Sequence, residues 1–401
     1  MSLIVQKFGG TSVKNAERIK NVARIIAETY LKGNDVLVVL SAQGDTTDDL
    51  IEKAAEINQK PSKREMDMLL STGEQISVSL CAMALDAMGL PCVSLNGWQV
   101  GIDSTSVHSD ARITNIATER VKRELDARRI VIVTGFQGVS RNGDITTLGR
   151  GGSDTSAVAL AAAFHADLCQ IYTDVDGVYT TDPRMEPNAK KLEEITYDEM
   201  LELASQGAQV LHNRSVELAK KFRINLEVVS SLERKPGTKV KEVTKMEKSN
   251  IAGVVKDTSI SGVALVGLAN TPGVAFKVFD LLSKRNINVD VILQSIGRED
   301  TKDITFTLHN KDLDEAVQVL EEHKGSLKFD HLKIDGKIGK VSIVGAGLVS
   351  NSGVASKMFE ALYEAGINIQ MINTSEIRVS VLLDEADVTN AVRAIHSKFF
   401  D

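Results

Sequence analysis

The stretch that decides the fold is Thr147-Leu148-Gly149-Arg150-Gly151-Gly152-Ser153-Asp154-Thr155-Ser156. Its three glycines let backbone amides come close to a ligand, and Arg150 offers a planar guanidinium group to a carboxylate. The alanine-rich run 157–163 that follows is typical of a helix. The stretch therefore predicts an anion-binding site at the start of a helix. A solvated glycine turn capped by Ser153 or Asp154 is the simpler alternative, but it leaves Arg150 unexplained.

Other polar, glycine-bearing loops follow short apolar strands elsewhere in the chain. Strands are predicted over 3–8, 36–40, 91–95, 130–134, 169–173 and 226–230. The first ends at Gly9-Gly10, the second in the loop 41–47, and the fourth at Gly135, from which a hairpin around Asn142-Gly143 leads into the glycine-rich stretch. Strands that alternate with helices in this way predict an open α/β sheet with its ligands at the carboxyl ends of the strands.

Two residues of the central sequence are harder to interpret. The helix predicted over 63–85 contains Glu74, and an ionised carboxylate in such apolar surroundings needs a partner. A polar loop runs through His108 to Arg112, and His108 is interpreted as an ordinary loop histidine because no second ligand lies near it in the sequence.

Composition narrows the class of protein. A chain of 401 residues with 43% hydrophobic and 25% charged residues is long enough for two or three soluble domains. A net charge of -7 argues against a nucleic-acid partner. Three cysteines, without metal spacing, are typical of reduced thiols in a cytosol. No signal peptide and no run of 18 consecutive apolar residues is found, so we expect a cytoplasmic enzyme or sensor without a membrane partner.

The last 150 or so residues contain an internal repeat. The segment 273–279 matches 353–359 at a shift of 80 residues, and each copy has the pattern of a small βαββαβ unit. Apolar periodicity disappears across 233–249, which is typical of a linker. The expected domains are an α/β domain over 1–232, the linker over 233–249, and two repeat units over 250–325 and 326–401.

The motifs together resemble those of the aspartate kinases, which have an amino-acid kinase fold followed by two C-terminal ACT regulatory domains. Four stretches carry the resemblance, in order: Lys7-Phe8-Gly9-Gly10-Thr11-Ser12, the loop 41–47, Gly149–Asp154 and Thr173–Arg184. With the doubled C-terminal unit, the resemblance covers essentially the whole chain. In one departure, Gln209 stands where many members have a lysine near ATP.

The resemblance implies transfer of a phosphoryl group from MgATP to the β-carboxylate of L-aspartate, giving 4-phospho-L-aspartate, the first step towards lysine, threonine and methionine. It implies a catalytic centre of Lys7, Gly9, Gly10 and Asp154. It implies aspartate binding by Ser41, Thr47, Glu74, Arg150 and Ser153. It implies nucleotide binding by Lys7, Gly10, Thr173, Asp174, Tyr179, Asp182 and Arg184, with no metal ligand from the protein because Mg²⁺ arrives with ATP.

Elementary chemistry agrees with this reaction. A β-carboxylate has an ordinary pKa of about 3.9 and is already ionised at neutral pH, so no general base is needed. Negative charge must be neutralised instead, which Mg²⁺, Lys7 and glycine amides would do. Arg150 suits a substrate carboxylate, and Glu74 or Asp154 suits the α-ammonium group.

The ACT resemblance implies feedback by lysine, threonine or both. The expected effector residues are Asn270, Thr271, Gly273, Val274, Gln294 and Ser295. Dimerisation alone is the simpler role for the repeat. We expect a homodimer or a higher oligomer through these units, and an internal start near Met246 would give a separate regulatory subunit.

Two alternatives stay open. A kinase of the same fold for another acidic amino acid would keep the phosphate loops without the combination of Thr47, Glu74 and Arg150. A non-catalytic amino-acid sensor would bind lysine or threonine without turnover, and Gln209 is the feature that supports it.

Overall fold

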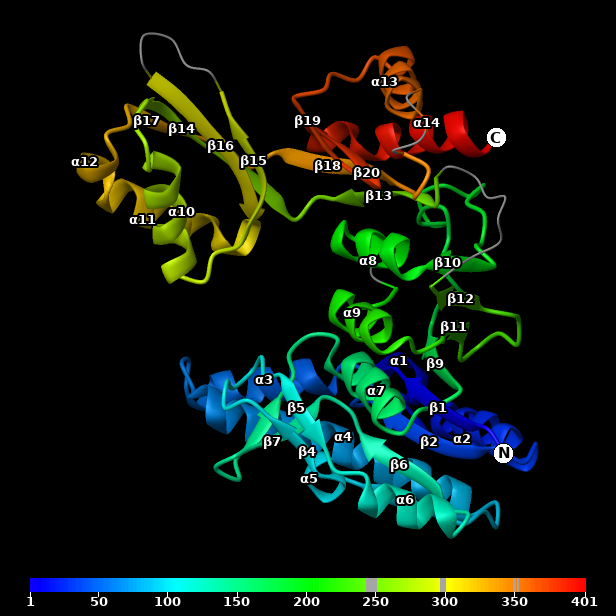
Figure 1. The fold of residues 1–401 in the computed structure, drawn as a ribbon. Coiled ribbons are helices and arrows are strands. Elements are labelled where there is room, and N and C mark those ends of the chain that lie inside the picture. Colours follow the sequence, from blue (N-terminus) through cyan, green and yellow to red (C-terminus); the bar gives the residue numbers. More distant parts are fainter. Residues whose placement is uncertain (209, 243–250, 296–300, 349–350, 352) are drawn as a thin grey trace. The chain divides into compact units, whose positions relative to one another are not determined.

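The computed structural model describes residues 1–208, 210–242, 251–295, 301–348, 351 and 353–401 (Figure 1). The chain forms two compact units. The first contains Met1–Tyr179 and Lys190–Lys248, and the second contains Thr180–Ala189 and Ser249–Asp401. Gln209, Met246 and residues 243–249 of the expected linker lie outside the described residues.

The first unit is built on an eight-stranded sheet. Its strand order is β10-β12-β11-β9-β1-β2-β6-β3. The bounds are β1 (Leu3–Phe8), β2 (Asp35–Leu40), β3 (Cys92–Leu95), β6 (Ile130–Thr134), β9 (Leu168–Thr173), β10 (Glu194–Thr196), β11 (Leu226–Ser230) and β12 (Thr238–Lys241). The six strands predicted from sequence are confirmed, and they run parallel to one another. Their carboxyl ends therefore meet along one edge of the sheet.

Helices cover both faces of this sheet. They are α1 (Gly10–Val13), α2 (Ala16–Leu31), α3 (Thr46–Ile57), α4 (Lys63–Asp86), α5 (Gly97–Val100), α6 (Glu119–Asp126), α7 (Gly152–Ala163), α8 (Tyr197–Ser205) and α9 (Asn213–Phe222). The apolar faces of α2 and α4 pack on alternate residues of the central strands, among them Phe8 and Val38. Helix α7 packs against β1, β2 and β9, and its residues from Gly152 to Ala161 are all buried. Small alanine side chains allow this close approach.

A second, smaller sheet carries the glycine-rich stretch. It has the order β5-β4-β7-β8, with β4 (Ile102–Ser104), β5 (Ile113–Ile116), β7 (Gln137–Ser140) and β8 (Ile145–Thr147). The predicted hairpin is confirmed, because β7 and β8 pair antiparallel and Gly143 adopts φ +82° in the turn. Strand β8 ends at Thr147, so this hairpin delivers Gly149 and Arg150 directly to the start of α7.

Helix α4 is long and apolar enough to cross a membrane by length and composition. In the fold it packs inside the first unit, where Val78, Cys81 and Leu85 are buried in the core. The acidic residues Asp67 and Glu74 of the same helix are also buried, and both accept hydrogen bonds from the protein. Packing within the unit therefore accounts for one face of α4, whereas Ile76, Leu80 and Met83 of the same helix are exposed.

The second unit contains two βα modules that match the predicted repeat. Module A has the sheet order β15-β16-β14-β17, with β14 (Ile260–Ala269), β15 (Val289–Gln294), β16 (Thr301–His309), β17 (His331–Asp335), α10 (Val274–Lys284), α11 (Leu313–Glu322) and α12 (Lys324–Leu327). Module B has the order β13-β18-β20-β19, with β13 (Gly253–Asp257), β18 (Ile338–Val344), β19 (Met371–Ser375), β20 (Arg378–Asp384), α13 (Val354–Glu364) and α14 (Val388–Phe400). Each module has its own apolar core between sheet and helices.

The strand pairing crosses the boundary that the sequence places between 325 and 326. Strand β13 precedes module A in the chain but pairs with β18 of module B. Strand β17 follows that boundary but pairs with β14 of module A. Each sheet therefore takes its outer strand from the other side of the expected division. Strand β12 likewise lies within the expected linker, where Thr238 and Val240 are buried in the first unit's sheet.

Candidate functional site

Lys7 and Asp154 form an ion pair where the main sheet meets the start of α7. Lys7 is the penultimate residue of β1, and Asp154 lies in the first turn of α7. The lysine Nζ lies 2.6 Å from the aspartate Oδ1, and the two side chains are only 11% and 12% exposed. The pair places one cation and one anion at the edge where the parallel strands end.

The loops after β1, β2 and β9 are joined by backbone hydrogen bonds. Gly9 N donates to Tyr172 O at 3.2 Å, and Gly44 N donates to Gly10 O at 3.0 Å. A Cβ on Gly10 would lie 2.8 Å from Ala42 O, so only glycine fits there. The predicted phosphate loop and the loop 41–47, which carries Ser41 and Thr47, are therefore in contact.

Glu74 lies behind the loop 41–47 and is 3% exposed. Its Oε1 accepts a hydrogen bond from Ala42 N at 3.1 Å, whereas its Oε2 is buried without a hydrogen-bond partner among the described residues. Burial raises the pKa of this carboxyl to about 8, against hydrogen bonds that lower it. The sequence predicts that Glu74 needs a partner. The described residues provide one for its Oε1 but none for its Oε2. A ligand cation would fit the second oxygen.

The glycine-rich loop is held in an unusual conformation by its surroundings. Gly149 and Gly151 adopt φ +75° and +68°, and Gly151 is the N-cap of α7. A Cβ on Gly151 would lie 2.2 Å from Cγ of His212. Arg214 Nη1 stabilises the loop by donating a hydrogen bond to Leu148 O at 2.9 Å. Neither His212 nor Arg214 is predicted from the sequence, because some 60 residues separate them from the loop.

Arg150 and Ser153 occupy different environments at this helix start. Arg150 is exposed, and among the described ion pairs none involves its guanidinium group, which leaves it available to a ligand. Ser153 is buried against Gly135, where an added Cβ would lie 2.6 Å from the serine Oγ. The loop after β6 therefore closes against the same helix start that carries Asp154.

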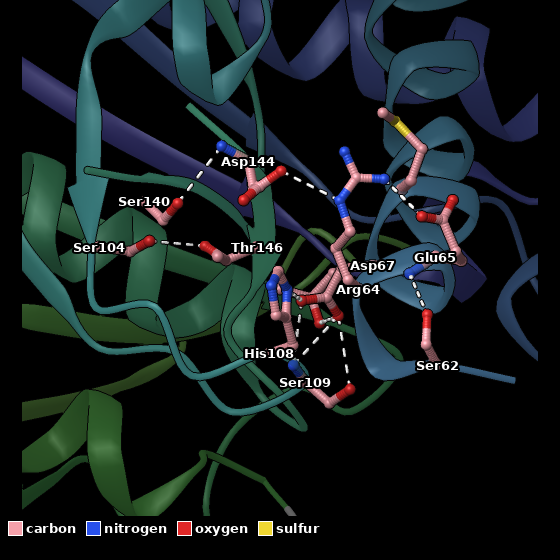
Figure 2. A network of polar contacts seen from close by, with 12 residues as sticks. Ser62, Arg64, Glu65, Asp67, Ser104, His108, Ser109, Ser140, Asp144 and Thr146 are labelled. Carbon is pink, nitrogen blue, oxygen red and sulfur yellow. Dashed lines mark hydrogen bonds and ion pairs between the residues drawn. The ribbon is translucent and has the colours of Figure 1, made fainter. Parts of the chain in front are cut away.

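A buried acid fixes the polar loop beside the glycine-rich stretch (Figure 2). Asp67 of α4 is fully buried and accepts hydrogen bonds from Thr147 Oγ1 at 2.6 Å and from Ser109 N at 3.1 Å. His108 Nδ1 lies 2.8 Å from the same carboxylate, so this histidine has a specific partner that its sequence neighbours do not reveal. Ala111 N then donates to Thr147 O at 2.9 Å. Asp67 thus ties the loop 105–112 to the end of β8.

We call the groups gathered at the carboxyl ends of β1, β2, β6 and β9 the strand-end cluster. It contains Lys7, Gly9, Gly10, Ser41, Thr47, Glu74, Arg150, Ser153 and Asp154. Among the described residues, no group of three or more histidine, cysteine, aspartate or glutamate side chains is arranged to hold a metal ion. The cluster combines the cations Lys7 and Arg150 with the glycine loops and one buried acid, Glu74.

The predicted nucleotide residues are divided between the two units. Thr173 ends β9 next to the Gly9 contact, and Asp174 follows it, exposed. Tyr179 donates to Asp176 Oδ1 at 2.7 Å, a bond that raises the pKa of Tyr179 to about 12. Asp182 and Arg184 belong to the second unit, where Arg184 Nη2 lies 2.8 Å from Asp182 Oδ2.

The predicted effector residues lie in module A. Asn270, Thr271 and Gly273 are exposed at the start of α10, and Val274 is buried beneath them. Gln294 and Ser295 are exposed at the end of β15, where Ser295 N donates to Asp303 O at 3.0 Å. The hydrogen bonds between described residues do not link the two groups.

Comparison with known proteins agrees with this architecture. The model of the Amino acid kinase family matches residues 2–230, and the model of the ACT domain matches residues 263–323 and 341–399. The fold and the strand-end cluster therefore define an amino acid kinase with two ACT modules.

Individual relatives identify the family more specifically. Aspartokinase 2 of Bacillus subtilis (strain 168) is 51% identical over 401 residues, covering 100% of this chain and 98% of the relative. An aspartokinase of Bacillus sp. (strain MGA3) is 50% identical over 400 residues, covering 100% of this chain and 97% of the relative. Aspartokinase III of E. coli, solved with aspartate and ADP, superposes with a TM-score of 0.85 at 27% identity and full coverage of both chains. This chain belongs to the aspartokinases of the amino acid kinase family.

Proposed function

We propose that this protein phosphorylates the β-carboxylate of L-aspartate with ATP, giving 4-phospho-L-aspartate, and that its ACT modules mediate feedback. The observation that carries the proposal is the strand-end cluster. In it a Lys7–Asp154 ion pair, a buried Glu74 whose Oε2 has no hydrogen-bond partner among the described residues, and an exposed Arg150 lie at one edge of the sheet. The solved E. coli relative in complex with aspartate and ADP supports the same assignment.

The proposed chemistry is charge neutralisation rather than proton abstraction. Lys7 would stabilise the charge on the transferring phosphoryl group, and the amides of Gly9 and Gly10 would bind its oxygens. Asp154 holds the lysine ammonium group in place at 2.6 Å, so the cation is positioned before a ligand arrives. Mg²⁺ bound to the ATP phosphates would supply further positive charge.

Substrate selection follows from two groups in the cluster. Glu74 Oε2 is buried without a partner and would accept from the substrate α-ammonium group, which would also favour ionisation of this carboxyl. Arg150 is exposed and would bind a substrate carboxylate through a bidentate pair. Ser41, Thr47 and Ser153 are the hydroxyl groups available nearby. A substrate that lacks the ammonium group would leave a buried acid unsatisfied.

The nucleotide is proposed to lie along Thr173, Asp174 and Tyr179, with Asp182 and Arg184 on the continuing segment. The regulatory proposal concerns lysine, threonine or both, bound at the start of α10. Support comes from the exposure of Asn270, Thr271 and Gly273 there, and from E. coli aspartokinase III, which was solved with lysine and aspartate and superposes with a TM-score of 0.78 at 27% identity.

We also propose an oligomer through the ACT modules and a cytoplasmic location. Strands β15 and β19 stand at the edges of their sheets and expose Ile292, Leu293 and Ile372, which favours pairing with a second copy. The three cysteines are free, which fits a reducing compartment. A separate regulatory subunit starting near Met246 remains a proposal, to be tested by immunoblotting with an antibody against α14.

The test is ATP-dependent formation of an acyl phosphate from L-aspartate, trapped with hydroxylamine, with and without lysine and threonine. Turnover that either amino acid suppresses supports both the kinase and its feedback. Turnover with glutamate in place of aspartate would instead identify a kinase for another acidic amino acid. Binding of lysine or threonine without any turnover would identify a sensor.

A further inference from the structure

One short segment of the chain leaves the first unit and returns to it. The chain passes out of the first unit after Tyr179 and re-enters it at Lys190. The residues between, Thr180–Ala189, fold as part of the second unit. We call them the anchor segment. They include Asp182 and Arg184 and continue directly from Thr173, Asp174 and Tyr179, so the proposed nucleotide loop and the anchor segment are one stretch of chain.

The anchor segment is held to module B by hydrogen bonds and by the packing of one side chain. Thr180 O accepts from Val254 N of β13 at 2.7 Å. Thr180 Oγ1 and His396 Nε2 of α14 form a hydrogen bond of 2.8 Å, with the two residues 2% and 0% exposed. Met185 O accepts from Arg393 Nε at 3.0 Å, and the Met185 side chain packs against the core of module B.

His396 is an unusual residue for the place it occupies. It lies on the buried face of α14 beside Ile395 and Val392, and its ring stacks on Phe400 with centroids 4.8 Å apart. A polar ring in such a core is costly unless it is hydrogen-bonded, and Thr180 supplies that bond. The histidine therefore selects one position of Thr180 in a way that an apolar residue would not.

Both ends of the anchor segment are fixed to the first unit. On the N-terminal side, Val178 N donates to Thr238 Oγ1 at 2.8 Å. On the C-terminal side, Lys191 binds Asp176 at 3.1 Å and pairs with Tyr179 in an isolated β-bridge. The middle of the same stretch is fixed to β13 and α14. The stretch from Asp176 to Lys191 is therefore one continuous piece of chain whose ends fold with the first unit and whose middle folds with module B.

We propose that His396 is a positioning residue for the nucleotide. Through Thr180 it sets the conformation of the loop that carries Tyr179, Asp182 and Arg184, and so the affinity for ATP, without contacting aspartate. The inference rests on the nucleotide role proposed for this loop. It assigns module B an indirect part in ATP binding, through Thr180, in addition to the effector role proposed for module A.

The test compares two amide variants of the full-length protein, His396→Asn and His396→Gln. Glutamine places an amide nitrogen near the position of the histidine Nε2, whereas asparagine reaches only the Nδ1 position. We expect His396→Asn to raise KM for MgATP about threefold to tenfold, the effect of one buried hydrogen bond, with KM for aspartate unchanged. His396→Gln should restore the value to within about twofold. Ser397→Ala, at an exposed neighbour on α14, is the matched control.

A second variant guards against misfolding as the explanation. Thr180→Val removes the hydroxyl group but keeps the shape, so it should reproduce the His396→Asn effect on KM for MgATP. The double variant should be no worse than either single one, because both remove the same bond. Additive effects, or a fall in melting temperature without a selective change in KM for MgATP, would overturn the proposal.

Failure of the proposed function would look different. A wild-type protein without turnover refutes the kinase assignment, yet ADP binding measured by calorimetry still compares the same variants. Loss of ADP affinity in His396→Asn but not in His396→Gln would then support the positioning role by itself. Equal ADP affinity in all variants would refute it.

Discussion

Two helices of this protein begin at a glycine in the left-handed region, and they do so in opposite surroundings. Gly151 starts α7 with φ +68°, and Gly273 starts α10 with φ +87°. A Cβ on Gly151 would collide with the ring of His212 at 2.2 Å, whereas a Cβ on Gly273 would have no atom within 4 Å. The first helix start is enclosed by protein, and the second is open. Similar sequence signals thus mark a helix start enclosed by protein in one unit and an open helix start in the other.

The enclosed start of α7 should be the more sensitive to mutation. Lys7, which pairs with Asp154 in the first turn of α7, tests this most directly. Lys7→Ala should lower kcat by roughly three orders of magnitude, because the transferring phosphoryl group loses its positioned cation. Stopped acyl phosphate assays at saturating aspartate and MgATP measure it. Lys20→Ala, on the exposed face of α2, is the matched control. A kcat within a few-fold of wild type would remove Lys7 from the catalytic centre.

Glu74 sharpens the comparison because only an enclosed site displaces a pKa this far. The folded carboxyl has a pKa of about 8, against an ordinary value of 4.5. As pH rises from about 4.5 to 8 the unfolded chain releases this proton while the folded one retains it, so stability falls with rising pH. Relative to Glu74→Gln, the wild-type protein should lose on the order of 4 kcal/mol over that range in urea unfolding.

The exposed Glu52→Gln is the control for that measurement, since its removal should leave the pH dependence of the wild type intact. Parallel curves for the wild type and Glu74→Gln would contradict a buried, protonated Glu74.

Gly151→Ala tests the enclosure itself. The new methyl group meets the His212 ring and the residue keeps an unfavourable φ, so the loop that carries Arg150 must move. A displacement near 1 Å should lower kcat/KM about a hundredfold. A Cβ on Gly151 would also lie 2.3 Å from the His212 Cβ, so adding His212→Gly, which removes both that Cβ and the ring, should recover part of the loss. A double variant no better than the single one would show that His212 does not shape the loop.

Arg150→Ala should act mainly on substrate binding. Loss of a charge-assisted pair to the carboxylate should raise KM for aspartate about tenfold to thirtyfold, with KM for MgATP and kcat changed far less. Steady-state kinetics in both substrates decides this. An unchanged KM for aspartate would place the substrate carboxylate elsewhere.

The smallest effect is expected at the open helix start. Gly273→Ala meets no neighbour and should cost only about 1 kcal/mol of stability, from its positive φ. Gly353, its counterpart in the repeat, has φ -86° and also has open space around it. Gly353→Ala should be neutral or stabilising by about 0.5 kcal/mol. Thermal unfolding of both variants measures these changes in stability. A loss in Gly273→Ala as large as that in Gly151→Ala would contradict the contrast between the two helix starts.

The parts that the sequence predicts are those that depend on local pattern. Five consecutive apolar residues in Val36–Leu40 indicate a strand buried on both faces, and the polar residues with Gly44 after it indicate a loop, because both signals lie within a few residues. The repeat is visible at 273–279 and 353–359 for the same reason. The fold class and the place of the strand-end cluster follow from these signals and from parallel pairing.

The parts that the sequence does not predict depend on distant partners. His108 looks like a loop residue until Asp67, 41 positions earlier, is found beneath it. The enclosure of Gly151 by His212 and the bond from Thr180 to His396 join residues still farther apart. Exchange of β13 and β17 between the modules has no local signal, since two short strands with suitable alternation fit either sheet.

That exchange has a consequence for the order in which the protein is made. Strand β13 ends at Asp257, but its partner β18 begins at Ile338. At roughly 5–20 residues per second on the ribosome, β13 emerges on the order of several seconds before any strand with which it can pair. Module A is finished in the meantime, when β17 emerges beside β14. Module A should therefore fold first. Module B should fold later, when β18 and the strands after it have been synthesised and can pair with β13.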